Sequence, residues 1–527
     1  MDSQQELMNE QDGQVANPSS DLKQWQRISP IAIVYFIVKF TYGIFSNVFY
    51  IAPVILISYK EVLANPQIWL PVSLAALSLL LLATFLTFYF FQYRLTSNNI
   101  EIRSGVFAKK YINLPFMRIQ NVKLEQPIYY RPFGFTCLQL DTAGSAQQEA
   151  KVVALKTELA EQIKKQILAS HTSQSILMAD VDLKNEEITQ QGNHEIVLNK
   201  RSLKDLVIHG VTNNRIWIFL GLLVAFFENI ANYTVQFFNS LGIDIEDLFK
   251  FVDKPLWQIG LYALTLTFLC MFVVALFSIA VSIISFYGYI LTKVTDRYVR
   301  RCGLLTKHEV TMRLARLQMV VRQQDWLDVL FNRINLKFEQ SNANIQHIQP
   351  GANNNKIIVP SVKPDECQAL IDDVYPQNKM MDVTYQRISK HFLIRNIFYI
   401  LLPIFCILVG LFISPEQNDV RAVIAPLFIV LILMTVCHWR RWGFAFDSHF
   451  IYIRKGMFGV NYYCFPRYKV QQTSFKQSWF LQRKKLASIR LVLASGAQDI
   501  PFIPQSIAYQ LINDALFEVE SSRKSWM

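Results

Sequence analysis

Six long apolar stretches constrain the fold of this chain more than any other feature of its sequence. Each is long enough, with some tilt or a kink, to cross a hydrocarbon layer about 30 Å thick. Apolar residues make up 52% of the chain and charged residues only 17%, which is unusual for a soluble protein. We therefore expect a membrane protein with six spanning helices, over residues 31–57, 68–91, 216–238, 256–291, 392–413 and 422–437.

The stretches come in pairs with short connections, near residues 59–67, 239–255 and 414–421, so we predict three helical hairpins. Lysine and arginine accumulate where each hairpin ends, whereas the connections are neutral or acidic. Because Lys and Arg near span ends are retained in the cytoplasm, both termini and every large polar region are expected to be cytoplasmic. The formal net charge of +12 is largely this bias.

A repeated pattern follows each hairpin, in one ungapped register that is counted forward from Gly105, Gly303 and Gly456. Position +13 is Arg118, Arg316 or Lys469, position +15 is Gln120, Gln318 or Gln471, and position +21 is Gln126, Gln324 or Gln477. Apolar residues recur at +33 and +35, as Leu138 and Leu140, Leu336 and Phe338, and Ile489 and Leu491. A block repeated at fixed spacing indicates internal triplication.

Each repeat is predicted to contain short strands followed by one helix. Ile100 and Ile102 alternate with polar residues before the first glycine, as Ile451 and Ile453 do before the third, which is typical of half-buried strands. Apolar residues at helical spacing come later in each block, at Leu159, Ile163 and Ile167, then Cys367, Leu370, Ile371 and Val374, then Ile507, Leu511, Ala515 and Leu516. Short antiparallel strands closed by one helix describe a small barrel-like domain.

The first repeat resembles a known family. "YRLT" at Tyr93, "RIQ" at Arg118, "RPFG" at Arg131 and "LDTAG" at Leu140 are similar to the bacterial pleckstrin-homology-like (PH-like) domain of YdbS/YdbT-type membrane proteins. The resemblance covers nearly the whole chain and implies the YdbT-type architecture. The implied fold is membrane α+β, with six transmembrane helices in three hairpins, each followed by a cytoplasmic PH-like small β-barrel with a C-terminal helix.

The expected domains follow from this architecture. They are a polar N-terminal tail at 1–26, hairpin 1 at 27–91, PH-like domain 1 at 92–170, a linker at 171–200, hairpin 2 at 201–291, PH-like domain 2 at 292–376, hairpin 3 at 385–440 and PH-like domain 3 at 441–521.

Two groups of residues are candidates for binding. The first surrounds the glycines, as Arg103, Lys109, Lys110, Arg300, Arg301, Arg454 and Lys455. Each such charge near an anionic leaflet contributes about 1 kcal/mol, although simple topology marking is an equal alternative. The second group is the Arg/Lys-x-Gln pattern of Arg118 and Gln120, Arg316 and Gln318, and Lys469 and Gln471. These groups offer several donors to a phosphate or a peptide, but we interpret the glutamines mainly as satisfying barrel backbone groups.

Two charged residues, Lys39 and Glu228, fall within predicted spans. A charge at the bilayer centre costs about 2.5–3.5 kcal/mol on insertion scales, so both are candidate functional residues. Lys39 is near the cytoplasmic end and can snorkel, whereas Glu228 lies deeper. A contact between them is conceivable and would favour a transporter or a lipid-handling channel.

The sequence offers little support for catalysis. It contains no H-E-x-x-H, G-x-S-x-G or Walker A motif, and its eight histidines are dispersed without ligand spacing. We expect no cofactor, no metal and no nucleic acid.

The leading prediction is a non-enzymatic bacterial inner-membrane protein that presents its PH-like domains to lipid headgroups or to proteins. The resemblance implies a smaller single-domain PH-like companion as a partner, and a role in envelope stress or antimicrobial-peptide resistance. The competing prediction is the transporter or channel that uses Lys39 and Glu228.

Overall fold

A computed structural model describes residues 24–45, 65–96, 98–106, 108–142, 150–167, 195–213, 256–340, 356–413, 418–457 and 459–521. The chain forms two compact units. One comprises Met1–Gln190 with Thr306–Glu309, and the other comprises Gln191–Leu305 with Val310–Met527.

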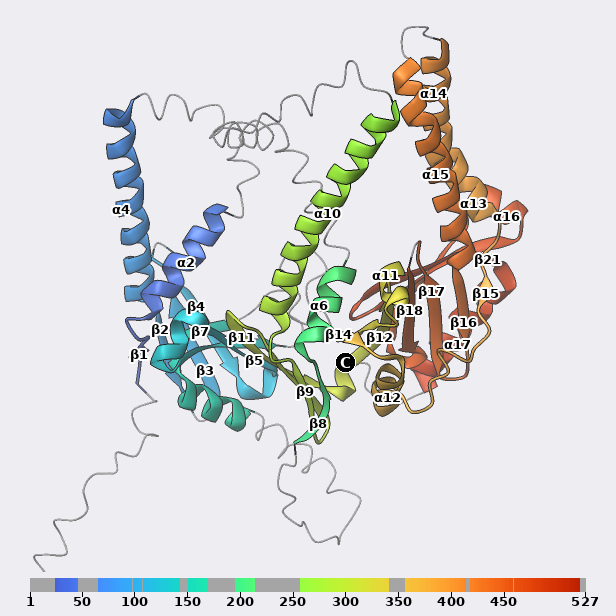
Figure 1. The fold of residues 1–527 in the computed structure, drawn as a ribbon. Helices are drawn as coiled ribbons and strands as arrows, with labels where there is room; N and C mark the ends of the chain where they lie inside the picture. Colours follow the sequence, from blue (N-terminus) through green and yellow to red (C-terminus); the bar gives the residue numbers. More distant parts are fainter. Residues whose placement is uncertain are drawn as a thin grey trace, which may run out of the picture. The chain divides into compact units, whose positions relative to one another are not determined.

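The first unit joins two apolar helices to a small barrel (Figure 1). Its elements are β1 (Gln26–Arg27), α2 (Ala32–Phe45), α4 (Pro66–Phe90), β2 (Gln92–Leu95), β3 (Asn99–Ser104), β4 (Lys110–Pro115), η1 (Phe116–Arg118), β5 (Ile119–Pro127), η2 (Ile128–Phe133), β6 (Phe135–Thr142), β7 (Ala150–Lys156) and a helix at 157–167. Strands β1-β2-β3-β4 form one antiparallel sheet, and β7-β6-β5 pair antiparallel beside it.

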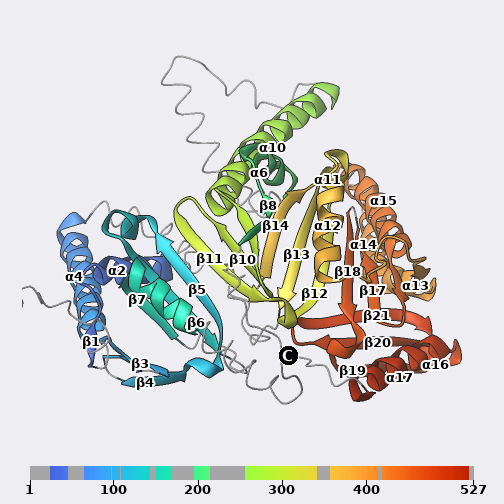
Figure 2. The same cartoon turned by 90° about the horizontal axis from the view of Figure 1, so that it is seen from below.

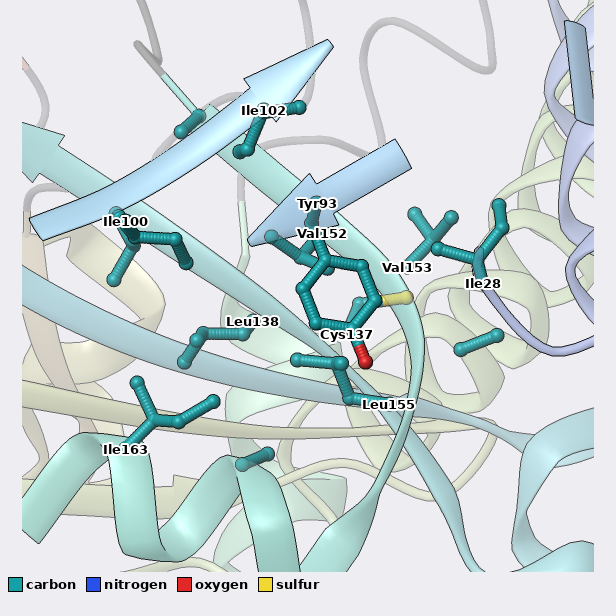
Figure 3. Packing of buried hydrophobic residues seen from close by; sticks show 14 of the residues in the cluster. Ile28, Tyr93, Ile100, Ile102, Cys137, Leu138, Val152, Val153, Leu155 and Ile163 are labelled. Carbon is teal, nitrogen blue, oxygen red and sulfur yellow. The ribbon is translucent and has the colours of Figure 1, made fainter. Parts of the chain in front are cut away.

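The core of this barrel lies between the two groups of strands and the closing helix, as Figure 3 shows. Ile100 and Ile102 from the first sheet meet Leu138 and Val152 from the second, and Ile163 of the helix closes the space. All five side chains are almost fully buried. Because alternate residues of a strand share one face, the predicted alternation at residues 100 and 102 is confirmed.

The second unit contains two barrels and their apolar helices, except for Thr306–Glu309 at the start of one strand. The second barrel is built from β8 (Ile196–Lys200), α6 (Leu203–Thr212), α10 (Leu256–Phe286), β9 (Ile290–Val294), β10 (Arg297–Cys302), β11 (Thr306–Arg313), η3 (Leu314–Arg316), β12 (Leu317–Gln324), α11 (Trp326–Leu330), β13 (Ile334–Gln340), β14 (Lys356–Val362) and α12 (Pro364–Val374). The third barrel is built from β15 (Gln386–Arg387), α13 (His391–Asn396), the π-helix η4 (Ile397–Leu401), α14 (Leu402–Ile413), α15 (Asn418–Arg441), β16 (Gly443–Phe446), β17 (Phe450–Lys455), β18 (Val460–Pro466), η5 (Arg467–Lys469), β19 (Val470–Lys476), α16 (Trp479–Arg483), β20 (Leu486–Leu493), β21 (Gly496–Pro504) and α17 (Gln505–Ser521).

The second and third barrels share one sheet. Strand β12 pairs antiparallel with β18, with Val320 opposite Cys464, and the seven strands run in the order β14-β13-β12-β18-β17-β16-β15. Figure 2 shows β14, β13, β12, β18 and β17 of this sheet. Val320 and Cys464 enter the core of the second barrel, whereas Met319 and Val321 enter the core of the third. Both faces of the middle of β12 are therefore buried, in keeping with the three consecutive apolar residues Met319, Val320 and Val321.

The three barrels share positive φ angles at equivalent positions as well as the same strand order. The turn residue at +29 is left-handed in every copy, with φ of 66° at Gly134, 50° at Asn332 and 52° at Lys485. A second positive φ recurs in the last strand, at Ala154, Ser361 and Phe502. Strained positions shared by dissimilar residues reflect one backbone design, and they support the predicted triplication.

The structure differs from the sequence predictions in three places. Residues Ile196–Lys200 of the expected linker form β8, which pairs with β9, and Leu516 is exposed on α17 rather than buried. Within the described residues, Pro66–Phe90 is the one helix long and apolar enough to cross a membrane by length and composition. The six-span arrangement therefore stays a prediction, since the proposed span at 216–238 lies outside the described residues.

Candidate binding surfaces

The glycine turns are built so that only glycine fits them. Gly105 and Gly303 adopt φ of 106° and 114°, a region that residues with a side chain rarely enter. A Cβ atom at Gly105 would lie 2.0 Å from the carbonyl oxygen of Ala108, and one at Gly456 would lie 2.0 Å from that of Gly459. The three residues that define the repeat register are therefore structural.

The glycine turns lie against the ends of the apolar helices. In the second barrel, the Gly303 N–H donates to the Tyr287 carbonyl at 2.8 Å, and the Leu304 N–H donates to that of Ile284 at 2.9 Å. In the third barrel, Nη1 of Arg441 donates to the Gly459 carbonyl at 3.0 Å. The two contacts in the second barrel satisfy carbonyls at the C-terminus of α10 that would otherwise have no intrahelical partner, and the Arg441 contact ties the turn of the third barrel to the last residue of α15.

The first glycine turn has the same place in its own barrel. Arg103 pairs with Gln92, which is two residues beyond the end of α4. The turn after β3 is therefore at the helix end of the sheet, as in the other copies.

The basic residues around the turns have different surroundings. Lys109 and Lys110 are exposed. The guanidinium of Arg103 lies 3.8 Å from the ring centroid of Trp25, in a cation–π contact that the sequence did not indicate. Beside it, the hydroxyl of Tyr111 and the guanidinium of Arg94 hold the pKa of Glu101 below its ordinary value.

In the second and third barrels the corresponding cations contact other groups of the chain. Arg301 pairs with Glu195 at 2.5 Å, and Arg300 donates to the Lys356 carbonyl at 3.4 Å. Arg454 donates to the Arg441 carbonyl at 3.2 Å, and Lys455 to Oε1 of Gln498 at 3.0 Å. Burial lowers the pKa of Lys455. The predicted cations thus share a location but not a common ligand geometry.

The Arg/Lys-x-Gln pattern lies at the opposite end of the first sheet of each barrel. Arg118, Arg316 and Lys469 end the short helices η1, η3 and η5, which follow the strand that leads away from each glycine turn. A strand of six residues is about 20 Å long. The structure therefore separates the two predicted groups rather than uniting them in one site.

The residues of this pattern also differ from one another. Arg118 is exposed. Burial and the neighbouring guanidiniums of Arg313 and Arg297 lower the pKa of Arg316 to about 10. Lys469 is 2% exposed and donates to the Ala315 carbonyl at 2.6 Å.

Each glutamine at +15 lies at a β-bulge. The register of the first pair of strands in the second sheet shifts between Ile119 and Asn121, between Leu317 and Met319, and between Val470 and Gln472. Gln318 is buried and contacts the Arg316 carbonyl at 3.5 Å, whereas Gln471 is exposed. The side chain of Gln120 lies outside the described set.

The glutamine at +21 has the backbone role that we expected at +15. Nε2 of Gln126 donates to the Phe135 carbonyl at 3.2 Å, and Nε2 of Gln477 donates to the Leu486 carbonyl at 2.9 Å. Both acceptors are at position +30, where the next strand begins. These two side chains close equivalent hairpins, so this part of the recurrent pattern stabilises the fold.

The two intramembrane candidates are not brought together in the described part of the chain. Lys39 is exposed on α2. Glu228 lies outside the described residues, so the proposed contact between the two stays a prediction.

Comparisons with known proteins define the class. The family described as the bacterial PH domain matches residues 42–171 and 394–515, which cover most of the first and third barrels. These two regions of the chain are therefore of the bacterial PH domain class. The second barrel lies between the matched regions, and the structure shows that it repeats their strand order.

One curated relative extends this likeness over most of the chain. The UPF0699 transmembrane protein YdbT of Bacillus subtilis (strain 168) is 20% identical over 438 residues, covering 80% of this chain and 85% of the relative. The predicted resemblance to YdbT-type proteins is confirmed. No solved structure matches the chain.

Proposed function

We propose that this is a non-enzymatic bacterial inner-membrane protein whose three PH-like domains dock on anionic lipid headgroups through their glycine turns. The observation that carries the proposal is the contact of these turns with the ends of the apolar helices α10 and α15. A turn at a helix end is held near the membrane surface if that helix crosses the bilayer. Six spans and cytoplasmic termini belong to the same proposal.

The chemistry of the turns supports this role. Lys109 and Lys110 are exposed beside the first turn, and a Lys or Arg close to an anionic leaflet contributes about 1 kcal/mol. The second and third turns also expose an apolar side chain, Leu305 at 45% and Met457 at 39%. A basic segment with an apolar residue at its tip is suited to the boundary between headgroups and acyl chains.

Docking on lipid leaves other surfaces of the barrels for protein contacts. We include in the proposal a smaller single-domain PH-like membrane protein as a partner, and a contribution to envelope stress or antimicrobial-peptide resistance. Both rest on the likeness to YdbT-type proteins.

Lipid titration of the purified full-length protein, followed by native mass spectrometry, tests the headgroup role. Phosphatidylglycerol is expected to bind more tightly than phosphatidylcholine, and Lys109→Gln or Lys110→Gln is expected to weaken it about fivefold, since each removes about 1 kcal/mol. Arg118→Gln is the matched control, because it removes one exposed charge at the other end of the same sheet. Equal affinity for the two lipids, or equal loss in the control, contradicts the proposal.

A further inference from the structure

Each barrel exposes large apolar side chains on the same short helical segment. We call η2, α11 and α16, which follow the first strand of the second sheet in each barrel, the wedge segments. Phe133 is 64% exposed, Leu330 71% and Phe480 76%. Other exposed apolar side chains at these segments are Ile128, Trp326, Val329, Phe331 and Trp479. Water-exposed apolar groups recurring at one place in three copies indicate a surface that is covered in use.

The wedge segment of the second barrel lies beside a helix that leads toward a predicted span. The Asp328 carboxylate of α11 accepts a hydrogen bond from Thr212, the last residue of α6. The predicted span begins four residues later. The surface of α11 is therefore close to the point where the chain is expected to enter the membrane.

Helix α6 is itself packed closely on α10. Oγ of Ser278 donates to the Gly210 carbonyl at 2.6 Å, and a Cβ atom at Gly210 would lie 2.5 Å from the Ile279 Cα. Ser278 is eight residues before the end of α10 at Phe286, which is about 12 Å at 1.5 Å per residue. The wedge segment thus lies beside the pair of helices α6 and α10, at a point along the axis of α10 well before its C-terminal end.

In the third barrel, the chain that leads toward the fifth predicted span contacts strand β21. The Ser389 N–H donates to the Phe502 carbonyl at 3.0 Å, and the ring of Phe392 lies 5.8 Å from that of Phe502. Phe392 is on α13, at the start of the fifth predicted span, and Figure 1 shows α16 at the end of the barrel from which α13 leaves. The side chains of α16 include Trp479, and the guanidinium of Arg483 lies 3.7 Å from the centroid of its ring.

We propose that the wedge segments insert their apolar side chains into the bilayer at the boundary between headgroups and acyl chains. The occupant is lipid rather than protein because the wedge segment of the second barrel contacts a helix that leads into a predicted span, and that of the third barrel is at the end of the barrel from which such a helix leaves. Tryptophan, present in Trp326 and Trp479, is also enriched at membrane interfaces. The inference rests on the proposed membrane docking but does not require anionic headgroups, since apolar burial is independent of lipid charge.

Site-specific photo-crosslinking tests the insertion. Benzoylphenylalanine replaces Phe133, Leu330 or Phe480 in the full-length protein, reconstituted in nanodiscs of either phosphatidylglycerol or phosphatidylcholine. The matched control is Phe517→benzoylphenylalanine, because Phe517 is 71% exposed on α17 and belongs to no wedge segment. We expect lipid adducts at the three wedge positions to exceed those at the control at least fivefold, in both lipids.

Adducts no more abundant than at Phe517, or crosslinks to protein in native membranes instead of lipid, would overturn the inference. Failure of the headgroup proposal gives a different result, namely loss of the phosphatidylglycerol preference with the wedge adducts retained. A second measurement guards against misfolding: Leu330→Ser and Phe480→Ser are expected to keep the melting temperature in detergent while reducing exchange protection of α11 and α16 in nanodiscs. A protection pattern unchanged in nanodiscs also contradicts the inference.

Discussion

Strands β12 and β19 hold the same place in the second and third barrels but have different neighbours. Strand β12 is paired on both sides, with β13 and β18, whereas β19 is at the edge of a three-stranded sheet in the described part of the chain. Met319 and Val321 of β12 are 1% and 4% exposed. Their counterparts at +16 and +18 in β19 are the polar residues Gln472 and Ser474, exposed and half-buried.

The outer face of the first sheet shows the same contrast. In the third barrel, Ala445, Tyr452 and Cys464 are buried in the core of the second barrel. Their counterparts in the first barrel, at −11, −4 and +8, are Arg94, Glu101 and Asn113. Polar residues thus replace apolar ones where the described part of the chain stacks no further barrel, as in the capping repeats of solenoid proteins and the protected edge strands of sheets.

The largest expected effect on stability is that of a charge on β12, which is compared with the same charge on β19. Val321→Asp buries a carboxylate in the shared core and is expected to cost about 4 kcal/mol or more. Ser474→Asp, at the same repeat position on β19, is expected to cost about 1 kcal/mol or less. Chemical denaturation of the purified protein in detergent measures both. Comparable losses would show that β19 is covered by protein as β12 is.

The pH dependence of stability tests the difference between buried Lys469 and exposed Arg118, which share position +13. Burial lowers the pKa of Lys469 to about 8, whereas in the unfolded chain it is about 10.4. Between these values the unfolded state binds more protons, so stability rises with pH by about 3 kcal/mol across the window.

Lys469→Met is expected to remove that rise, and Arg118→Met, at the exposed counterpart, is expected to leave it intact. Melting temperatures of the protein and both variants between pH 7.5 and 10.5 measure the difference. An unchanged slope in Lys469→Met would mean that this ammonium is not buried at the junction.

A smaller effect is expected at position +8. Cys464→Asn introduces an amide opposite Val320, in a fully buried place, and is expected to cost about 2 kcal/mol. Asn113→Cys, the reverse change on β4, is expected to shift stability by about 0.5 kcal/mol or less because Asn113 is exposed. Urea unfolding midpoints compare the two variants. A large loss of stability in Asn113→Cys would contradict the difference between the first sheets of the first and third barrels.

The smallest effect on stability is expected when β19 is made to resemble β12. Gln472→Met with Ser474→Val is expected to leave the unfolding free energy within about 0.5 kcal/mol. An apolar edge strand pairs readily with other strands, so the variant is expected to form larger species in size-exclusion chromatography. Gln472→Asn with Ser474→Thr is the polar control. A monodisperse apolar variant would show that these residues do not protect the edge.

Much of the fold was predictable because the repeat register is carried by residues with firm structural roles. Leu138, Leu336 and Ile489, at +33, are all fully buried, and Gly105 and Gly303 need their positive φ. The left-handed turn at +29 was visible only in the first copy, as Gly134. Asn332 and Lys485 occupy the same conformation without a glycine to mark it.

The site was less predictable than the fold. The pattern at +13 to +15 was read as one unit, yet Arg118 is exposed and Lys469 is buried, because Lys469 lies at the junction with the second barrel and contacts the Ala315 carbonyl there. That junction depends on pairing between strands of two repeats, and the sequence alone does not specify which edges meet. In the wedge segments, Trp326 and Trp479 share repeat position +23. The sequence alone does not distinguish these two tryptophans from core residues, and only the structure shows that they are exposed.

The strand pair β12 and β18 also has a consequence for how the molecule is made. The second barrel is synthesised before the strand that completes it, so Met319 and Val321 stay in contact with water until the third barrel emerges. Because β12 contributes side chains to both cores, neither core is complete without the other barrel. A truncated protein that ends after α12 would carry an open, apolar strand, and the natural place to divide this chain is therefore not between these two repeats.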